Sequence, residues 1–96
     1  MKYVKVRWVH GHSGQPVMLY SELDDDMWEI RKVEVYANGH ADFADNEVQS
    51  GTTMLGVVPI PPLDQIAADP EFEPMAISAA EFEILWERAK SSAERA

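Results

Sequence analysis

Apolar and polar side chains alternate at the start of the chain with the two-residue period of a half-buried β-strand. Val4, Val6 and Trp8 lie on one side of this alternation, and Lys5 and Arg7 lie on the other. The pattern predicts a first strand that runs from residue 3 to residue 9.

Three further strands are predicted in the first half of the chain, over residues 17–23, 27–36 and 40–44. These stretches are rich in aromatic and β-branched residues, which favour strands. The first begins only after Pro16, because proline has no amide hydrogen for a ladder. In the longest strand the apolar parity changes midway, which predicts a β-bulge near Arg31 and Lys32.

Asn38 and Gly39 separate the last two of these strands. An Asn-Gly pair is favoured at the two central positions of a type I′ turn, where both residues need a positive φ. The sequence therefore predicts a two-residue hairpin with positive φ at both positions.

The sequence of residues 45–60 predicts no helix and little strand. An irregular loop is expected up to residue 56, with a short extended piece at residues 52–55, and the apolar residues 57–60 are expected to be extended. The acidic segment from Pro70 to Pro74 is predicted to be a turn.

Two helices are predicted in the second half of the chain. A short one follows Pro61 and Pro62 over residues 63–68, because proline is accepted only at the start of a helix. A longer one covers residues 79–93, where Ser78 and Glu81 have the spacing of a capping box. Its apolar residues recur with helical spacing, at Phe82, Leu85, Trp86 and Ala89.

Strands at the front and helices at the back predict one α+β domain over residues 1–96. We expect an antiparallel meander sheet of four or five strands packed against the C-terminal helix, with one short additional helix. Trp8, Trp28 and Trp86 are predicted to be core residues. Trp86 is expected to matter most, because it shares the apolar stripe of the helix.

Composition excludes several classes of function. The 96 residues include 8 Lys and Arg against 17 Asp and Glu, so the surface should repel nucleic acid. The chain has no cysteine, which excludes disulfides, thiolate nucleophiles and Cys-ligated metals. It shows neither a signal-peptide pattern nor a run of 18 apolar residues, so a cytoplasmic protein without membrane contact is expected.

Negative charge is concentrated between Tyr36 and Glu87, where there are ten carboxylates and no Lys or Arg. Such a field speeds association with a basic protein, and the alternative is a solvated surface. Acidic loops can reach a basic cleft, which makes six residues the predicted partner-binding set. They are Asp24, Asp25, Asp26, Asp42, Asp45 and Glu47.

The main alternative is a small enzyme or ligand-binding domain that uses the loop from His10 to Gln15. Its predicted site residues are His10, His12, Glu29 and Arg31. Together with His40 the two loop histidines lack a ligand spacing, so no metal and no cofactor are predicted. No serine lies in a nucleophile elbow and no phosphate-binding loop is present, so no catalytic residue is assigned. Self-association through sheet edges is a third possibility, so either a monomer or a homodimer is compatible with the sequence.

Two longer motifs stand out: S-E-L-D followed by W-E-x-R-K-V-E-V and an aromatic residue, over residues 21–36, and I-P-P-L-x-x-I over residues 60–66. They resemble the motifs of an uncharacterised bacterial family of small acidic stand-alone domains. The resemblance covers residues 3–89 and implies no activity for any residue. Domains of this size and charge are similar to immunity proteins that neutralise basic toxins. The predicted function is therefore a non-catalytic domain that binds a basic protein such as a toxin.

Overall fold

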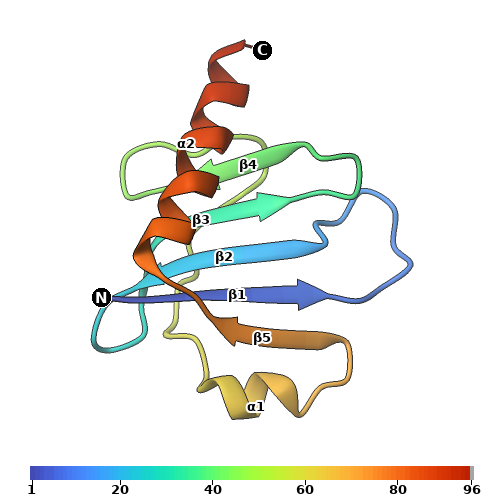
Figure 1. The fold of residues 1–96 in the computed structure, drawn as a ribbon, viewed down its shortest axis with the longest axis vertical. Helices are drawn as coiled ribbons and strands as arrows, with labels where there is room; N and C mark the ends of the chain where they lie inside the picture. The colour runs from blue at the N-terminus through green and yellow to red at the C-terminus, as the bar shows by residue number, and fades with distance from the viewer. Residues whose placement is uncertain (96) are drawn as a thin grey trace.

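In the computed structural model, which describes residues 1–95, a five-stranded antiparallel sheet has one long helix across its front face (Figure 1). The elements are β1 (Lys2–Trp8), β2 (Met18–Leu23), β3 (Glu29–Val35), β4 (Ala41–Ala44), α1 (Leu63–Ala67), β5 (Phe72–Ala76) and α2 (Ala79–Arg95). The strand order is β4-β3-β2-β1-β5, so the first four strands form a meander and β5 joins its far edge. The predicted α+β class, with its C-terminal helix and one short helix, is confirmed.

β5 corrects the prediction of a turn at residues 70–74. This strand pairs antiparallel with β1, where Val6 lies opposite Pro74. The amide of Ile77 donates to the carbonyl of Tyr3, so alternate residues face β1 and the amide position of Pro74 points away from the ladder. Proline is accepted at such an edge position. The segments 52–55 and 57–60, which were expected to be extended, do not join the sheet.

The bulge predicted in β3 lies slightly earlier than expected. Glu22 of β2 pairs with Arg31, and the next residue, Leu23, pairs with Glu29, which leaves Ile30 as the extra residue. An extra residue reverses the side-chain parity of one strand relative to the next. Glu29 and Arg31 therefore belong to opposite faces of the sheet.

The turn between β3 and β4 has three residues instead of the two predicted. The Gly39 amide donates to the Tyr36 carbonyl at 2.9 Å, and the Tyr36 amide donates to the His40 carbonyl at 2.8 Å. Gly39 has φ 89°, but Asn38 is not among the described non-glycine residues with positive φ, so the type I′ prediction is wrong. Asn38 instead acts through its side chain, whose Oδ1 accepts the His40 amide at 2.9 Å.

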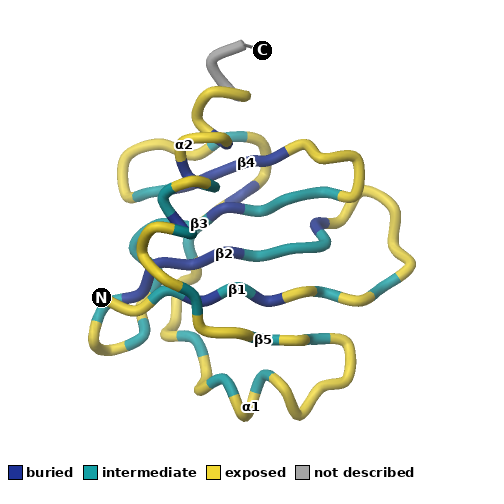
Figure 2. The backbone as a smooth tube through the Cα atoms, in the orientation of Figure 1, coloured by how far each residue is buried: buried dark blue, intermediate teal, exposed yellow. Residues whose placement is uncertain are grey.

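The predicted apolar stripe of α2 forms the main core with the front face of the sheet. Phe82 and Ala89 are fully buried, and Trp86 is 5% exposed and packs edge-on against Phe43 at 5.2 Å between ring centroids. The Ser78 hydroxyl accepts the Glu81 amide at 3.1 Å, which is one half of the predicted capping box, whereas the Glu81 carboxylate binds Lys5. Figure 2 shows burial along β4 and at positions in β1, β2 and β3, whereas β5 and α1 are mostly exposed.

The other tryptophans do not belong to this core. Trp28 is 42% exposed in the β2–β3 turn. Trp8 is partly exposed, lies beside Phe72 and donates its indole N–H to Glu71 at 3.2 Å. The prediction of core tryptophans is therefore correct for Trp86 alone.

Truncation of Trp86 should cause a large loss of stability. Trp86→Ala removes a buried ring between α2 and the sheet and should lower the free energy of unfolding by about 3 to 5 kcal/mol. Trp28→Ala is the matched control, and its half-exposed ring should change the same quantity by less than about 1 kcal/mol. Urea unfolding followed by circular dichroism measures both, and equal effects would contradict the packing of α2 described above.

The hairpin glycine provides a second test. Gly39→Val places a β-branched residue at φ 89° and should cost about 1 to 3 kcal/mol through backbone strain. Gly11→Val is the control, because a Cβ at Gly11 meets no atom within 4 Å and Gly11 is not among the positive-φ glycines. Thermal unfolding of the two variants should separate them clearly, and equal midpoints would show that the turn tolerates side chains at Gly39.

Candidate functional site

The three aspartates between β2 and β3 differ in exposure and in hydrogen bonding. Asp24 closes the turn, because its Oδ1 accepts the amides of Asp26 at 2.9 Å and Trp28 at 3.0 Å. Met27 completes the turn with φ 68°. The side chains of Asp25 and Asp26 are exposed, so two of the three predicted partner-binding aspartates face solvent.

Asp42 is 8% exposed, and its carboxylate is used inside the domain. Its Oδ1 lies 3.1 Å from the Nε2 of His40 and accepts the Ser50 hydroxyl at 3.0 Å. A Cβ added to Gly51, which has φ 57°, would lie 2.4 Å from Asp42 Oδ2, so the loop backbone passes directly over this carboxylate.

Asp45 and Glu47 lie just beyond β4. The Oδ1 of Asp45 accepts the amides of Glu47 at 2.8 Å and Val48 at 2.7 Å. These two hydrogen bonds stabilise the charged form and hold the pKa of Asp45 below its ordinary value. The side chain of Glu47 is exposed.

Carboxylates on the back face of the sheet hold the segment that connects β4 to α1. The Glu29 carboxylate accepts the Gly56 amide at 2.7 Å, and Glu34 accepts the hydroxyl of the fully buried Thr53 at 2.5 Å. This segment runs behind the strands in Figure 1, on the side opposite α2. Both faces of the sheet are therefore covered: α2 packs on the front face, and hydrogen bonds to Glu29 and Glu34 hold this segment to the back face.

Arg31 lies on the front face, beneath α2. It forms a bidentate pair with Glu22, at 2.7 Å from Nε and 3.0 Å from Nη2, and it also binds Glu83 of the helix. Its guanidinium carbon lies 4.9 Å from the ring centroid of Phe82 and 5.0 Å from that of Trp86. The arginine joins the sheet to the helix, which is a structural role.

This pairing perturbs two ionisable groups. The hydrogen bonds from Arg31 lower the pKa of the Glu22 carboxyl, although its burial acts in the opposite direction. The Tyr3 hydroxyl donates to Glu22 at 2.8 Å, and loss of this hydrogen bond on deprotonation raises the pKa of Tyr3.

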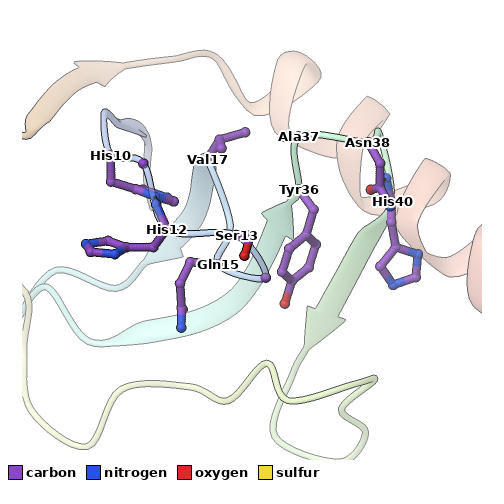
Figure 3. Close-up of a pocket in the computed structure, with 11 residues that line it drawn as sticks. His10, His12, Ser13, Gln15, Val17, Tyr36, Ala37, Asn38 and His40 are labelled. Carbon is purple, nitrogen blue, oxygen red and sulfur yellow. Dashed lines mark hydrogen bonds between the residues drawn. The ribbon is translucent and has the colours of Figure 1, made fainter.

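The loop from His10 to Gln15 lines a cavity of about 630 Å³ together with the β3–β4 turn. In Figure 3 the rings of His10 and His12 lie on one side, and Tyr36 and His40 lie on the other. His10 Nε2 donates to the Pro16 carbonyl at 2.8 Å, and its Nδ1 accepts the His12 amide at 2.9 Å, which requires the neutral tautomer with the proton on Nε2.

The predicted alternative site is divided among three places. His10 and His12 line this cavity, whereas Arg31 lies under α2 and Glu29 lies on the back face. His40 lines the same cavity, but within residues 1–95 no three His, Asp or Glu side chains come together in a group that could hold a metal ion.

Sequence reasoning missed the polar residues of the back face. Ser21, Lys32, Glu34 and Thr53 all take part in its contacts. The alternation of Lys32 and Glu34 with valines places these two residues on one face. It does not show that a distant segment covers that face.

A family model described as Domain of unknown function (DUF6881) matches residues 2–91 of the chain. No curated protein and no solved structure matches the chain in the other two comparisons. No helix within residues 1–95 is long and apolar enough to cross a membrane.

The lowered pKa of Glu22 predicts a pH-dependent stability. Near the ordinary pKa of Glu the unfolded chain binds more protons at this position than the folded chain, so the contribution of Glu22 is complete above that pKa. It is lost as pH falls through the lower pKa of the folded state. Urea unfolding between about pH 6 and pH 3 should therefore show a fall in stability that is smaller in Glu22→Gln than in the wild type.

Part of this fall should remain in the variant, because the pKa of Asp45 is also lowered. Glu73→Gln removes an exposed pair with Arg7, whose atoms are 3.8 Å apart, and should leave the pH profile unchanged. A Glu22→Gln profile identical to that of the wild type would contradict the coupling of Glu22 to Arg31.

Proposed function

Because the chain belongs to the DUF6881 family, whose description names no activity, we propose a function from its charge distribution. The protein is a non-catalytic binding domain whose acidic surface engages a basic protein partner. The observation that carries the proposal is that most strand cations form ion pairs within the chain, whereas several carboxylates stay exposed. Four of the five cations of β1 and β3 lie within 4 Å of carboxylates of the same chain, namely Lys5, Arg7, Arg31 and Lys32, whereas Lys2 at the start of β1 is exposed.

Several carboxylates stay exposed while these cations are paired. Asp25 and Asp26 are exposed in the β2–β3 turn, and Asp64 is exposed in the first turn of α1. The Ile60 amide donates to the Met27 carbonyl at 2.9 Å, which places the segment that enters α1 beside the aspartate turn. Excess negative charge of this kind raises the association rate with a basic protein and disfavours acidic competitors.

Immunity proteins that neutralise basic toxins are comparable in size and charge. A basic toxin is therefore the first partner class to test, and its inhibition would come from occupation of its active site. This step rests on analogy of size and charge.

Self-association through sheet edges is less well supported. The amide and carbonyl of Phe43 in β4 bind Ser50, so the chain's own loop covers that edge. On the opposite edge, the outward position at Pro74 has no amide hydrogen to offer another strand.

Ligand binding by the loop from His10 to Gln15 is the second candidate. It is favoured by the cavity of about 630 Å³, which lies within the usual size range of ligand pockets. Failure to capture any protein partner from cells that express the protein would favour this candidate.

The proposal predicts a salt-dependent association. A partner is first captured and identified, and its association rate is then measured by stopped-flow mixing at several salt concentrations. Charge steering is screened over about 8 Å at physiological ionic strength, so the rate should fall steeply as salt increases while dissociation changes less. A salt-independent association rate would refute electrostatic recruitment.

Matched variants make this test specific. A double variant, Asp25→Asn with Asp26→Asn, should slow association without changing the unfolding midpoint, because both side chains are exposed. The pair Asp25→Glu with Asp26→Glu keeps the charge and should retain the wild-type rate. Equal rates in the two double variants would exclude this turn from the partner surface.

A further inference from the structure

A second cavity, of about 390 Å³, lies between the back face of the sheet and the segment that enters α1. It is separate from the histidine-lined cavity and from the α2 core. Its walls are mainly apolar side chains of the strands and the covering segment: Val4, Val6, Leu19, Ile60, Ile66 and Phe72. A concave apolar space with few polar groups is typical of small-molecule sites.

Five polar residues line this cavity: Ser21, Glu29 and Lys32 from β2 and β3, and the exposed Gln65 and Asp69 from α1 and the turn that follows it. The Glu29 side chain is 5% exposed, and its Oε2 accepts the Ser21 hydroxyl at 2.8 Å. Its Oε1 accepts the Gly56 amide at 2.7 Å. These contacts fix the position of the carboxylate, and each oxygen has a second lone pair to offer a ligand.

The ammonium group of Lys32 can donate further hydrogen bonds. Its side chain is 19% exposed, and its Nζ lies 3.6 Å from Glu29 Oε1 and 3.4 Å from the Met54 carbonyl. Both contacts are longer than an ordinary hydrogen bond to an ammonium group, which carries three N–H donors. A ligand acceptor placed beside Lys32 would therefore gain a charge-assisted hydrogen bond.

On the sheet side of the cavity the opposite charges of Glu29 and Lys32 lie 3.6 Å apart and offset one another, whereas the Oδ1 of Asp69 accepts the Glu71 amide at 2.9 Å. A carboxylate ligand would meet Lys32 but would lie close to Glu29, and an ammonium ligand would meet Glu29 but would lie close to Lys32. A neutral head that both accepts and donates hydrogen bonds satisfies the two residues together. A primary amide is the simplest such group.

We propose that this cavity binds a small neutral molecule with an apolar body and an amide-like head. The body occupies the space between Val6, Leu19 and Ile66. The carbonyl of the head accepts from Lys32, and its N–H donates to the Glu29 carboxylate. Binding at this place requires no protein partner, so it goes beyond the function proposed from surface charge.

The experiment compares three probes that share a phenyl ring on a short alkyl chain: 3-phenylpropanamide, 3-phenylpropanoate and 3-phenylpropylamine. Each is titrated into ¹⁵N-labelled full-length protein and followed by amide chemical shifts. The amide probe should bind with a dissociation constant on the order of 1 mM, as expected for so small a ligand. Saturable shifts should concentrate at Val6, Leu19 and Phe72, and both charged probes should bind about tenfold more weakly.

Two matched lysine variants test the role of the head. Lys32→Met keeps the length of the side chain and should weaken binding of the amide probe about tenfold. Lys5→Met also removes a lysine–glutamate pair, but it does so on the front face, where Lys5 binds Glu81 at 3.3 Å. It should leave the affinity unchanged.

Three results would overturn the proposal. They are the absence of saturable shifts around this cavity, equal affinity for the three probes, and equal loss of affinity in the two lysine variants. Because the comparison of probes uses the wild-type protein, it decides the matter even if Lys32→Met does not fold. Capture of a basic protein partner bears on the function proposed above and not on this result.

Discussion

Ile30 is the extra residue of β3, and the pairing on either side of it sends the flanking charged side chains to opposite faces of the sheet. The Arg31 side chain lies on the front face and binds Glu22 and Glu83 beneath α2. The Glu29 side chain lies on the back face and accepts a hydrogen bond from the Gly56 amide. Without the bulge both side chains would share one face, because residues two apart in a regular strand have the same parity. The attachment of both covering layers therefore depends on this irregularity.

The two layers are attached by different physical means. On the front, α2 contributes Phe82, Trp86 and Ala89 to an apolar core, and Arg31 lies against the two aromatic rings. On the back, hydrogen bonds from the Gly56 amide and the Thr53 hydroxyl to carboxylates hold the covering segment, beside the apolar residues that line the second cavity. A carboxylate that accepts hydrogen bonds loses little by being covered, whereas one left alone in an apolar space would be costly. Some of the acidity of this chain thus serves its own folding.

Local patterns predicted the fold well wherever neighbouring residues determine the structure. The alternation at Val4 and Val6, the prolines before α1 and the helical stripe around Phe82 each specify an element without reference to the rest of the chain. β5 was missed because its pairing with β1 is a long-range contact and because Pro74 is unfavourable in a strand unless its amide position faces outward. The Asn-Gly pair predicted a hairpin correctly and its turn type wrongly, since Asn38 binds through its side chain.

The candidate sites were less predictable for a related reason. Asp42 and Asp25 are both aspartates near a turn, yet one is enclosed by a loop and the other is exposed. Composition cannot distinguish them, because burial is decided by a segment that passes over one residue and not the other. The histidine loop was identified from its turn-forming residues, but its proximity to Tyr36 depends on how the strands pair.

The position of β1 between β2 and β5 has a consequence for how the chain reaches this structure. Lys5 pairs with Tyr20 on one side and with Met75 on the other. The first pairing closes a short loop, whereas the second must wait for most of the chain, and contacts between distant residues form slowly. During synthesis the four-stranded meander is complete long before β5 is made. Until then β1 is an open edge strand, and such an edge is prone to pair with other chains. Pairing of β5 with β1 therefore removes an edge strand through which the chain could aggregate.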